Sequence, residues 1–402
     1  MSSYLLPAIT YIPELHKYIL PIVSENNNRD KIIINRTLHK YLSILKKQID
    51  ECEVAWDKFK KYTNPYEFIH TIIPNTRQSI CTYKPLSRSF FKMIEMSHML
   101  NILNDLPQDK CKTFHLAEGP GGFIEAVVYL RKNINDQYYG MTLLEESNHN
   151  IPGWRKSKNF LHDNPNVIIE TGADGKGDLM NSKNLIHCYK KYKGQFDLIT
   201  GDGGFDFSVH YLSQEIVSAS LIISQISFAI AMQKKGGTFI IKMFDTFSKV
   251  SLDILYLLSN IYETVHFVKP HTSRYANSEK YIVCKKFRIN EVQRQELINS
   301  FFKMLVTLQA TENNRIINNL FNFELPYYFI NKLEEYNSIF GQQQVENIGI
   351  TLNLIDNNKH DKLELFKKNN LHKCITWCQQ NRMEYNISVQ PSNIFLSNKK
   401  SL

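Results

Sequence analysis

The sequence predicts an α/β fold: a mostly parallel, doubly wound sheet of seven strands with helices on both faces, and helical additions at the N- and C-termini. Two observations lead to this prediction. Between residues 112 and 287, short apolar runs alternate with longer amphipathic segments, as in strand–helix–strand units. Glycine-rich turns follow two of these runs, at 119–122 and 201–204. Open parallel sheets bind their ligands at such carboxyl ends of strands.

Seven apolar runs are predicted to be the strands of the sheet. They cover residues 113–117, 137–144, 167–170, 196–200, 238–241, 264–268 and 281–285. Strands of a parallel sheet are covered on both faces, so they show continuous apolar runs instead of a strict alternation with polar residues. Two of the helices between them are predicted at 123–131 and 214–235 from their apolar spacing. We place this domain at residues 81–287.

Helical segments are predicted on either side of this domain. Leu38, Leu42 and Leu45 recur at helical spacing in the N-terminal part of the chain, and prolines divide this part into short segments. After residue 287 the strand pattern mostly stops and apolar residues again follow helical spacing. We therefore expect a helical N-terminal extension at 1–80 and a helical C-terminal subdomain at 288–402.

The composition narrows the class of protein. The 402 residues are 43% hydrophobic and 22% charged, which excludes global disorder. The net charge of +9 is compatible with a polyanionic partner such as a nucleic acid. Seven scattered cysteines indicate a reducing compartment, and no apolar run has the length of a membrane span. We expect a soluble intracellular protein without a membrane partner.

A metal site is not expected. Cys374 and Cys378 lie close to His372, but a structural zinc site takes four ligands and no second pair completes this one. Ordinary residues on a helix are the simpler interpretation of this spacing.

The first turn at the predicted ligand edge follows the apolar run 113–117 and opens a helix. It contains Gly119, Pro120, Gly121, Gly122 and Phe123. Glycines permit a tight turn and a close approach of the backbone to a ligand, and a strand-to-helix loop of this kind can hold an adenosine cofactor. The turn has neither the Gly-x-Gly-x-x-Gly spacing of dinucleotide-binding proteins nor a P-loop sequence. A tight turn without a ligand is the alternative.

Five ionisable residues are candidates for chemistry at or near the same edge. Asp202 follows a strand between glycines, Asp178 lies in a glycine-rich loop, and Lys242 ends an apolar strand. A buried lysine needs a partner or a function, because burying an unpaired charge is costly. Lys92 lies on a predicted helix before the sheet, and Glu279 precedes the last strand. Each has an ordinary alternative as a turn former or as a solvent-exposed charge.

In combination, these motifs resemble the FtsJ-type, or RrmJ-like, 2′-O-ribose methyltransferases. The hallmark of that family is a Lys-Asp-Lys-Glu tetrad, which Lys92, Asp202, Lys242 and Glu279 match in order and in motif context. The closest resemblance is to the cap-specific mRNA 2′-O-methyltransferases of eukaryotes and large DNA viruses. It is carried between Tyr62 and Phe287 by Asn64-Pro65-Tyr66-Glu67, Gly119-Pro120-Gly121-Gly122-Phe123, Gly140-Met141-Thr142-Leu143, Asp174-Gly175-Lys176-Gly177-Asp178, Asp202-Gly203-Gly204-Phe205, Lys242-Met243-Phe244-Asp245 and Asn277-Ser278-Glu279-Lys280-Tyr281.

The resemblance implies a Rossmann-like methyltransferase fold and S-adenosyl-L-methionine as the cofactor. Asp178 would face the adenine, and Asp202 and the turn 119–123 would hold the rest of the cofactor. The tetrad would be catalytic: Lys242 would orient a ribose 2′-hydroxyl and accept its proton, Lys92 would add positive charge, and the two acids would position the lysines. No metal is implied. The implied reaction is 2′-O-methylation of the first transcribed nucleotide of capped mRNA (cap 1).

Four basic residues are candidates for contacts with RNA phosphates. They are Arg88, Arg155, Lys156 and Arg274. Phosphate contacts set register and salt dependence without recognising the base sequence. Capped mRNA would be the main partner, with other capping enzymes or the transcription machinery as further ones. A viral enzyme would act in the host cytoplasm or virion, and a cellular one in the nucleus.

Two positions depart from the family pattern, and three alternatives stay open. Tyr275 stands where a proline is common, and Glu118 stands where many members have a small residue.

The same tetrad would serve a 2′-O-methyltransferase for rRNA or tRNA, which is the first alternative. A non-catalytic RNA-binding subunit of a capping complex is the second alternative, although inactive copies normally lose tetrad residues. A nucleotide-dependent dehydrogenase is the third, and the missing dinucleotide motif argues against it.

Overall fold

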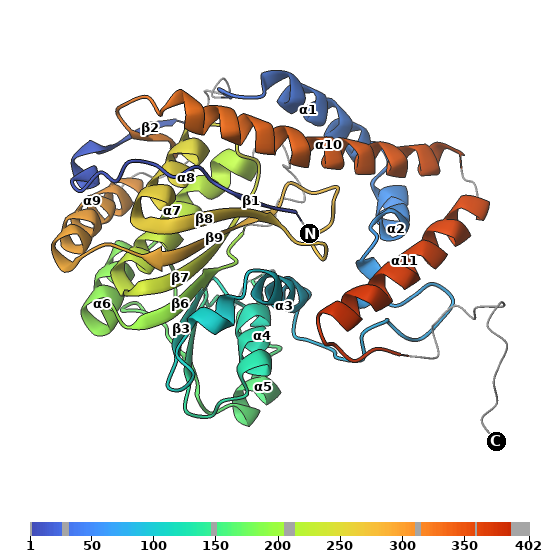
Figure 1. Ribbon diagram of the computed structural model, residues 1–402, viewed down its shortest axis with the longest axis horizontal. Coiled ribbons are helices and arrows are strands. Elements are labelled where there is room, and N and C mark those ends of the chain that lie inside the picture. The colour runs from blue at the N-terminus through green and yellow to red at the C-terminus, as the bar shows by residue number, and fades with distance from the viewer. Residues whose placement is uncertain are drawn as a thin grey trace.

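The computed structural model describes residues 2–25, 32–145, 151–204, 214–309, 315–357 and 360–386. Eight strands form one sheet: Ser2–Leu5 (β1), Lys112–Leu116 (β3), Gln137–Met141 (β4), Val167–Ile169 (β5), Phe196–Gly201 (β6), Gln233–Met243 (β7), Tyr262–Lys269 (β8) and Lys280–Phe287 (β9). Their spatial order is β1-β8-β9-β7-β6-β3-β4-β5 (Figure 1). Seven of them are the strands predicted from apolar runs, so the predicted α/β fold class is confirmed.

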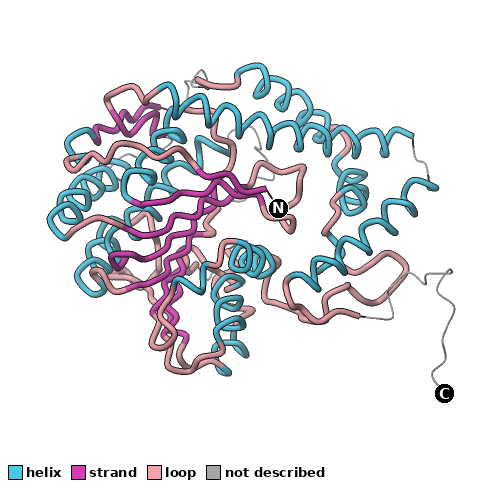
Figure 2. The backbone as a smooth tube through the Cα atoms, in the orientation of Figure 1, coloured by secondary structure: helices cyan, strands magenta, loops and turns pink. Residues whose placement is uncertain are grey.

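The middle of the sheet is parallel and one flank is antiparallel. β3 pairs in parallel with β4 and β6, and β5 and β7 extend this parallel part on either side. β9 lies antiparallel between β7 and β8. Figure 2 shows the strands side by side with helices on both faces of the sheet. Because the chain builds the sheet outward from β3 in both directions, the loops after β3 and β6 diverge, and sheets of this class bind ligands at such a switch point.

The helices divide between the two faces of the sheet. They span Arg36–Asp50 (α1), Glu53–Thr63 (α2), Ser89–Met99 (α3), Gly122–Arg131 (α4), Lys158–Asp163 (α5), Ser182–Tyr192 (α6), Gln214–Met232 (α7), Lys249–Ile261 (α8), Glu291–Gln309 (α9), Tyr327–Asn357 (α10) and His360–Gln380 (α11), with short 3-10 helices at Leu15–Tyr18, Glu67–Ile69 and Ile102–Asp105. Residues of α6, α7, α8 and α9 build the core on one face, and residues of α3, α4 and α11 build it on the other.

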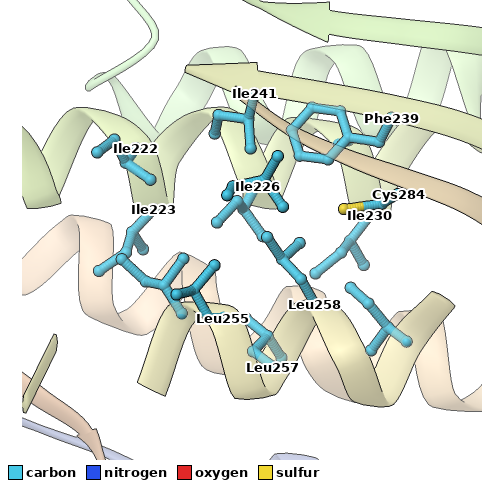
Figure 3. Close-up of a cluster of buried hydrophobic side chains, with 14 of the residues drawn as sticks. Ile222, Ile223, Ile226, Ile230, Phe239, Ile241, Leu255, Leu257, Leu258 and Cys284 are labelled. Carbon is cyan, nitrogen blue, oxygen red and sulfur yellow. The ribbon is translucent and has the colours of Figure 1, made fainter. Parts of the chain in front are cut away.

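Strand β7 shows how the sheet supplies both cores. Phe239 and Ile241 belong to the core under α7 and α8, whereas Ile240 belongs to the core on the opposite face, since successive side chains of a strand alternate. Figure 3 shows Ile226 of α7 between β7 and α8, with Leu258 of α8 beside it. Helix α7 is long and apolar enough to cross a membrane by length and composition, but most of that stretch is buried inside the protein, as in a core helix.

The two terminal additions are mainly helical, but they also contain strands. β1 extends the sheet by pairing antiparallel with β8. Ile19–Glu25 (β2) pairs with Arg315–Phe321 (β10) in a separate two-stranded sheet. These short strands gain their hydrogen bonds from partners far away in the chain, and for that reason the local sequence pattern did not predict them.

The N- and C-terminal additions pack against each other. Figure 1 shows α10 along the top of the molecule beside α1, with α2 and α11 at its far end. α10 contacts α1 and α2, and α11 contacts α2. Polar bonds fix this arrangement, because Asn370 Nδ2 of α11 donates to the carbonyl oxygen of Tyr62 (2.7 Å) and the hydroxyls of Thr63 and Thr351 lie 2.7 Å apart. The additions therefore contact each other through α1, α2, α10 and α11, while β1 joins the sheet and α9 packs on one of its faces.

Candidate active site

The loop between β3 and α4 is a tight turn, and a side chain within it caps the N-terminus of α4. The Gly119–Pro120 peptide bond is cis, and Gly121 has a φ of 113°, in the left-handed region that favours glycine. Glu118 Oε1 accepts hydrogen bonds from the backbone N–H groups of Phe123 (2.6 Å) and Ile124 (3.0 Å) at the N-terminus of α4. Glu118, which departs from the family pattern, thus satisfies two N–H groups that a helix leaves without partners.

The four tetrad residues form two ion pairs at the carboxyl ends of β6 and β7. Lys92 Nζ, on α3, lies 2.6 Å from Glu279 Oε1, in the loop before β9. Lys242 Nζ, near the end of β7, lies 3.2 Å from Asp202 Oδ1 and donates a 2.8 Å hydrogen bond to the carbonyl oxygen of Asp202. All four side chains are at most 15% exposed. The structure therefore brings all four predicted residues together in two buried pairs.

The hydroxyl of Tyr281 joins the two ion pairs. It donates to Asp202 Oδ1 (2.8 Å) and accepts from Lys92 Nζ (3.3 Å), although Lys92 and Tyr281 are 189 residues apart in the chain. The result is a continuous hydrogen-bonded chain from Glu279 through Lys92, Tyr281 and Asp202 to Lys242. Sequence reasoning gave Tyr281 no role. Its position two residues after Glu279, at the start of a strand, was the available clue, because alternate strand residues share a face.

Burial and charge shift the protonation of this cluster. Burial lowers the pKa of Lys92, and the carboxylates of Glu279 and Asp202 oppose that shift. Burial alone would raise the pKa of Glu279, but Lys92, Lys242 and Lys269 together hold it well below its usual value. Glu279 therefore stays ionised throughout the physiological pH range.

The pKa of Glu118 shifts in the opposite direction from that of Glu279. Burial raises the pKa of Glu118 to about 8, the negative charge of Asp202 adds to the shift, and the two backbone N–H groups of α4 oppose it. This carboxyl is therefore largely protonated at neutral pH. Gly203, next to Asp202, approaches the start of the glycine turn so closely that an added Cβ would lie 2.9 Å from Cβ of Ala117, so the turn lies beside the tetrad.

The loop that carries Glu279 is held from several sides. The carboxylate of Glu95, one turn after Lys92 on α3, accepts from the backbone N–H groups of His271 (2.8 Å) and Thr272 (3.1 Å). Lys269 Nζ donates to the carbonyl oxygen of Glu279 at 2.7 Å. Because α3 contacts this loop through both Lys92 and Glu95, the separation between Lys92 and Glu279 is set by packing as well as by charge.

The other predicted cofactor residues lie around the same edge. Asp178 is in the loop after β5, half-buried, and its Oδ1 accepts from the backbone N–H of Met180 at 2.8 Å. Gly122 begins α4. Phe123 is completely buried, with its ring 5.7 Å from that of Tyr281, so its side chain belongs to the core. Phe205, the last residue of the motif at 202–205, lies outside the described residues.

The four basic residues predicted to contact RNA fall into two groups. Arg274 donates to both carboxylate oxygens of Glu67, and Arg88 donates to the carbonyl oxygen of Thr272, so both lie by the Glu279 loop. Arg155 and Lys156 are exposed in the segment after β4. The structure therefore brings Arg88 and Arg274 toward the tetrad, whereas Arg155 and Lys156 lie on a different segment.

A pocket of about 380 Å³ opens beside the tetrad. Lys242 and Glu279 line it from the sheet side, and Trp56 of α2 and Gln344 and Asn347 of α10 line it from the two additions. The sequence motifs did not predict this wall, because α2 and α10 come together with the sheet only in the folded chain. Among the residues that the structure describes, no group of three His, Cys, Asp or Glu side chains could hold a metal ion.

A doubly wound sheet with a glycine turn after β3 and a lysine–carboxylate cluster at its carboxyl edge defines a Rossmann-like methyltransferase. The family model described as FtsJ-like methyltransferase matches residues 85–287, half of the chain. The protein belongs to the FtsJ-like methyltransferase family.

Two relatives of this chain are named as cap-specific mRNA methyltransferases. Cap-specific mRNA (nucleoside-2′-O-)-methyltransferase 1 of Mus musculus is 29% identical over 294 residues, which cover 68% of this chain and 32% of the mouse protein. The protein of that name in Homo sapiens is 31% identical over 246 residues, covering 56% and 28%. This chain thus spans about a third of the length of these relatives. Among solved structures, an rRNA methylase from Streptococcus thermophilus is 13% identical, covering 48% of this chain and 96% of that chain, with a TM-score of 0.31.

Proposed function

We propose that this protein is an S-adenosyl-L-methionine-dependent RNA 2′-O-ribose methyltransferase that modifies the first transcribed nucleotide of capped mRNA. The observation that carries the proposal is the buried chain of two lysine–carboxylate pairs, joined by Tyr281, at the edge of a pocket. Membership of the FtsJ-like family supports methyl transfer, and the names of the mouse and human relatives support a capped mRNA substrate.

The carboxyl edge of the sheet fits a cationic adenosine cofactor. The carboxylate of Asp202 lies at this edge beside Lys242, and Asp178 lies in the loop after β5. Opposite charges favour each other strongly in such a partly buried site. When bound, S-adenosylmethionine supplies a methyl group made electrophilic by its sulfonium. Asp202 and the turn 119–122 would hold its methionine and ribose part, and Asp178 would accept a hydrogen bond from the adenine amino group.

In the proposed mechanism, Lys242 orients the ribose 2′-hydroxyl and accepts its proton at Nζ. Asp202 fixes that nitrogen through its carboxylate and its carbonyl oxygen. Lys92 places a second positive charge near the developing alkoxide, and Glu279 holds Lys92 in place. General base catalysis of this kind contributes about 10²–10⁴-fold. Fixed alignment of the reacting atoms contributes about 7–11 kcal/mol more.

The substrate and the organisation of the chain are part of the proposal. Capped mRNA is the partner, with Arg88 and Arg274 beside the tetrad and Arg155 and Lys156 at the exposed segment as phosphate contacts. Other capping enzymes or the transcription machinery are further partners. The methyltransferase domain covers 81–287, and the additions at 1–80 and 288–402 pack against it and against each other. A 2′-O-methyltransferase for rRNA or tRNA is the second candidate, because the tetrad chemistry would be the same.

The deciding experiment is methyl transfer from labelled S-adenosylmethionine to three RNAs of one sequence: 7-methylguanosine-capped, unmethylated-capped and uncapped. An RNA that is already 2′-O-methylated at the first nucleotide is the control. We expect label on capped RNA and none on the control. Label on all three RNAs would move the substrate to another RNA class. No label on any RNA, with cofactor binding intact, would contradict the proposed activity.

A further inference from the structure

The pairing of the strands places Glu118 at the same edge as two tetrad residues. Leu116, two residues before Glu118, is paired across β3 and β6 with Gly201, the residue before Asp202. Gly201 is also paired with the residue of β7 that precedes Lys242. Because neighbouring strands lie about 4.7–4.9 Å apart, Glu118, Asp202 and Lys242 follow the ends of three adjacent strands at one edge of the sheet.

Among the residues that the structure describes, Glu118 is a buried acid of this edge that forms no ion pair. Lys242 is paired with Asp202, and Lys92 is paired with Glu279. Glu118 is 4% exposed, and its Oε1 accepts both N–H bonds from the start of α4. The proton of the neutral carboxyl therefore lies on Oε2. A buried carboxyl without a counterion is most stable in this neutral form.

The surroundings of Glu118 leave its charge open to change. Burial raises the pKa of Glu118 to about 8, the charge of Asp202 adds to the shift, and the N–H groups of α4 and the charge of Lys242 oppose it. The side chains that come closest to the glycines of the turn are uncharged: Leu86, Ser87, Ser89, Ile124, Thr142 and Trp154. A further positive charge at this edge would therefore favour the ionised form of Glu118.

The proposed cofactor carries such a charge. S-adenosylmethionine contains a sulfonium, whereas the product S-adenosylhomocysteine contains a neutral sulfide in its place. Both compounds have the same ammonium and carboxylate groups, so the charge on sulfur is the electrostatic difference between them. A carboxylate at this edge would favour the sulfonium, because opposite charges attract more strongly in a buried site than in water.

We propose that Glu118 releases its proton when S-adenosylmethionine binds and regains one after methyl transfer, so that the site prefers the sulfonium cofactor over the sulfide product. On binding, the proton leaves Oε2 for the solvent. During transfer the methyl group passes from sulfur to the ribose oxygen, the hydroxyl proton passes to Lys242, and sulfur keeps the electron pair and loses its charge. Glu118 then takes a proton back from the solvent.

The inference rests on the proposed function, because it takes S-adenosylmethionine as the cofactor. It deepens that function by assigning a role in cofactor specificity to a side chain that stands where many members of the family have a small residue. The cap on α4 needs only the Oε1 atom of this side chain, so the cap and the proposed change of charge are separate properties of Glu118.

The test is isothermal titration calorimetry of the full chain at pH 7 in buffers of different ionisation enthalpy, which measures the protons released on binding. With S-adenosylmethionine, we expect the wild type to release at least about half a proton more than Glu118→Gln. With S-adenosylhomocysteine, we expect the two proteins to release nearly equal numbers. The amino group of each ligand titrates in both proteins, so its contribution cancels in the comparison.

The same titrations measure affinity. Glutamine removes the charge and keeps the cap, because its side-chain oxygen can accept the same two N–H groups. We expect Glu118→Gln to lower the preference for S-adenosylmethionine over S-adenosylhomocysteine about tenfold, the equivalent of one pKa unit. Because binding releases a proton, the affinity of the wild type for S-adenosylmethionine rises more steeply between about pH 6 and pH 8 than that of the variant.

Glu125→Gln is the matched control. Glu125 is also a buried acid of α4, with 6% of its surface exposed. Its carboxylate accepts hydrogen bonds from the backbone N–H of Leu86 (2.8 Å) and the hydroxyl of Tyr83 (3.0 Å), away from the ends of β6 and β7. We expect this variant to keep the proton release and the cofactor preference of the wild type.

Two results overturn the proposal. One is equal proton release by the wild type and Glu118→Gln on binding S-adenosylmethionine. The other is equal extra release by the wild type with both ligands, because the carboxyl would then respond to the ammonium group that they share.

The titrations use no RNA, so the two proposals fail separately. Proton release that depends on Glu118, in a protein that methylates no RNA, contradicts only the proposed function. Methyl transfer by a protein without this release contradicts only the role of Glu118. A protein that binds no S-adenosylmethionine contradicts both.

Discussion

Single residues at the tetrad illustrate how a folded chain keeps buried charges. Lys92 and Lys242 each have a carboxylate within 3.2 Å, and Tyr281 shares its hydroxyl between the two pairs. A buried ion without such partners would lose several kcal/mol of solvation that nothing restores. The arrangement therefore keeps Lys92 and Glu279 paired next to Lys242, the proposed acceptor of the ribose proton.

Replacing Lys242 with alanine separates catalysis from cofactor binding. We expect Lys242→Ala to lower the rate of methyl transfer by about 10²–10⁴-fold, because the proposed general base is lost. Cofactor binding stays within about twofold of the wild type, since the turn 119–122 is untouched. The measurements are single-turnover transfer and a binding titration. A variant that retains wild-type turnover would show that Lys242 has no part in the chemistry.

Removing the charge of Glu279 tests the buried pair. We expect Glu279→Gln to reduce the free energy of unfolding by about 3–5 kcal/mol, because Lys92 keeps its charge in a buried position without its partner. Chemical denaturation measures this change. Lys332→Met is the control, because the ion pair of Lys332 with Glu335 is about half exposed on both sides and contributes little. Equal effects of the two substitutions would contradict the assigned importance of the buried pair.

At the scale of elements, the short helix Glu67–Ile69 is tied to the Glu279 loop by one ion pair. Arg274 donates to both carboxylate oxygens of Glu67, whose side chain is 1% exposed. Burial alone would raise the pKa of Glu67, but Arg274 and the charge of Arg88 hold it well below its usual value. An acid with a lowered folded-state pKa stabilises the fold above its unfolded-state pKa and loses that contribution as the pH falls.

This linkage predicts the acid sensitivity of the fold. Below about pH 4.3, the ordinary pKa of glutamate, the unfolded state takes up a proton before folded Glu67 does, so stability falls with pH. We expect Glu67→Gln to make this fall less steep in urea denaturation between about pH 4.5 and pH 2. Glu263→Gln, which removes an exposed partner of Lys286, leaves the slope unchanged. An unchanged slope in Glu67→Gln would contradict the linkage.

Helix α7 makes its contribution through burial. Ile226 is completely buried between β7 and α8, as Figure 3 shows. We expect Ile226→Ala to lower the free energy of unfolding by about 2–5 kcal/mol, from lost burial and from the cavity that remains. Val217→Ala on the same helix is the control, because Val217 is 36% exposed. Denaturant titration with an unchanged slope distinguishes a loss of stability from a change in the unfolded state.

At the scale of the whole molecule, the C-terminal addition shares the core of the sheet domain. Phe329, Leu333 and Phe340 of α10 belong to the same buried cluster as the residues of α7, α8 and β7. A separate domain would have a core of its own. The proposed boundary at 287/288 therefore marks where the sequence motifs end. The hydrophobic core continues across it.

This shared core predicts the result of a truncation. We expect the fragment 1–287 to be insoluble or to unfold without a cooperative transition, because the apolar face beneath α9 and α10 becomes exposed. Thermal unfolding followed by circular dichroism tests this, with the full chain as the control. A soluble fragment with a sharp transition would show that the domain folds alone.

The local sequence determined most of the fold and indicated the residues of the candidate tetrad. Apolar runs and glycine turns are short-range features, so the seven central strands and the turn at 119–122 could be predicted from them. Lys92, Asp202, Lys242 and Glu279 were singled out only in combination, through the resemblance to a known family, because each alone has an ordinary alternative. A sequence motif does not specify how far its residues lie from those of another motif in the folded protein.

Tertiary structure decided the contacts that bring these residues together in the candidate site. The shared hydroxyl of Tyr281, the support of the Glu279 loop by Glu95, and the pairing of β1 with β8 join segments far apart in the chain. The pocket wall from α2 and α10 arises in the same way. Each of these contacts depends on which helix and sheet faces pack together. That choice is made by the burial of apolar side chains from the whole chain, and the pattern of a single segment does not determine it.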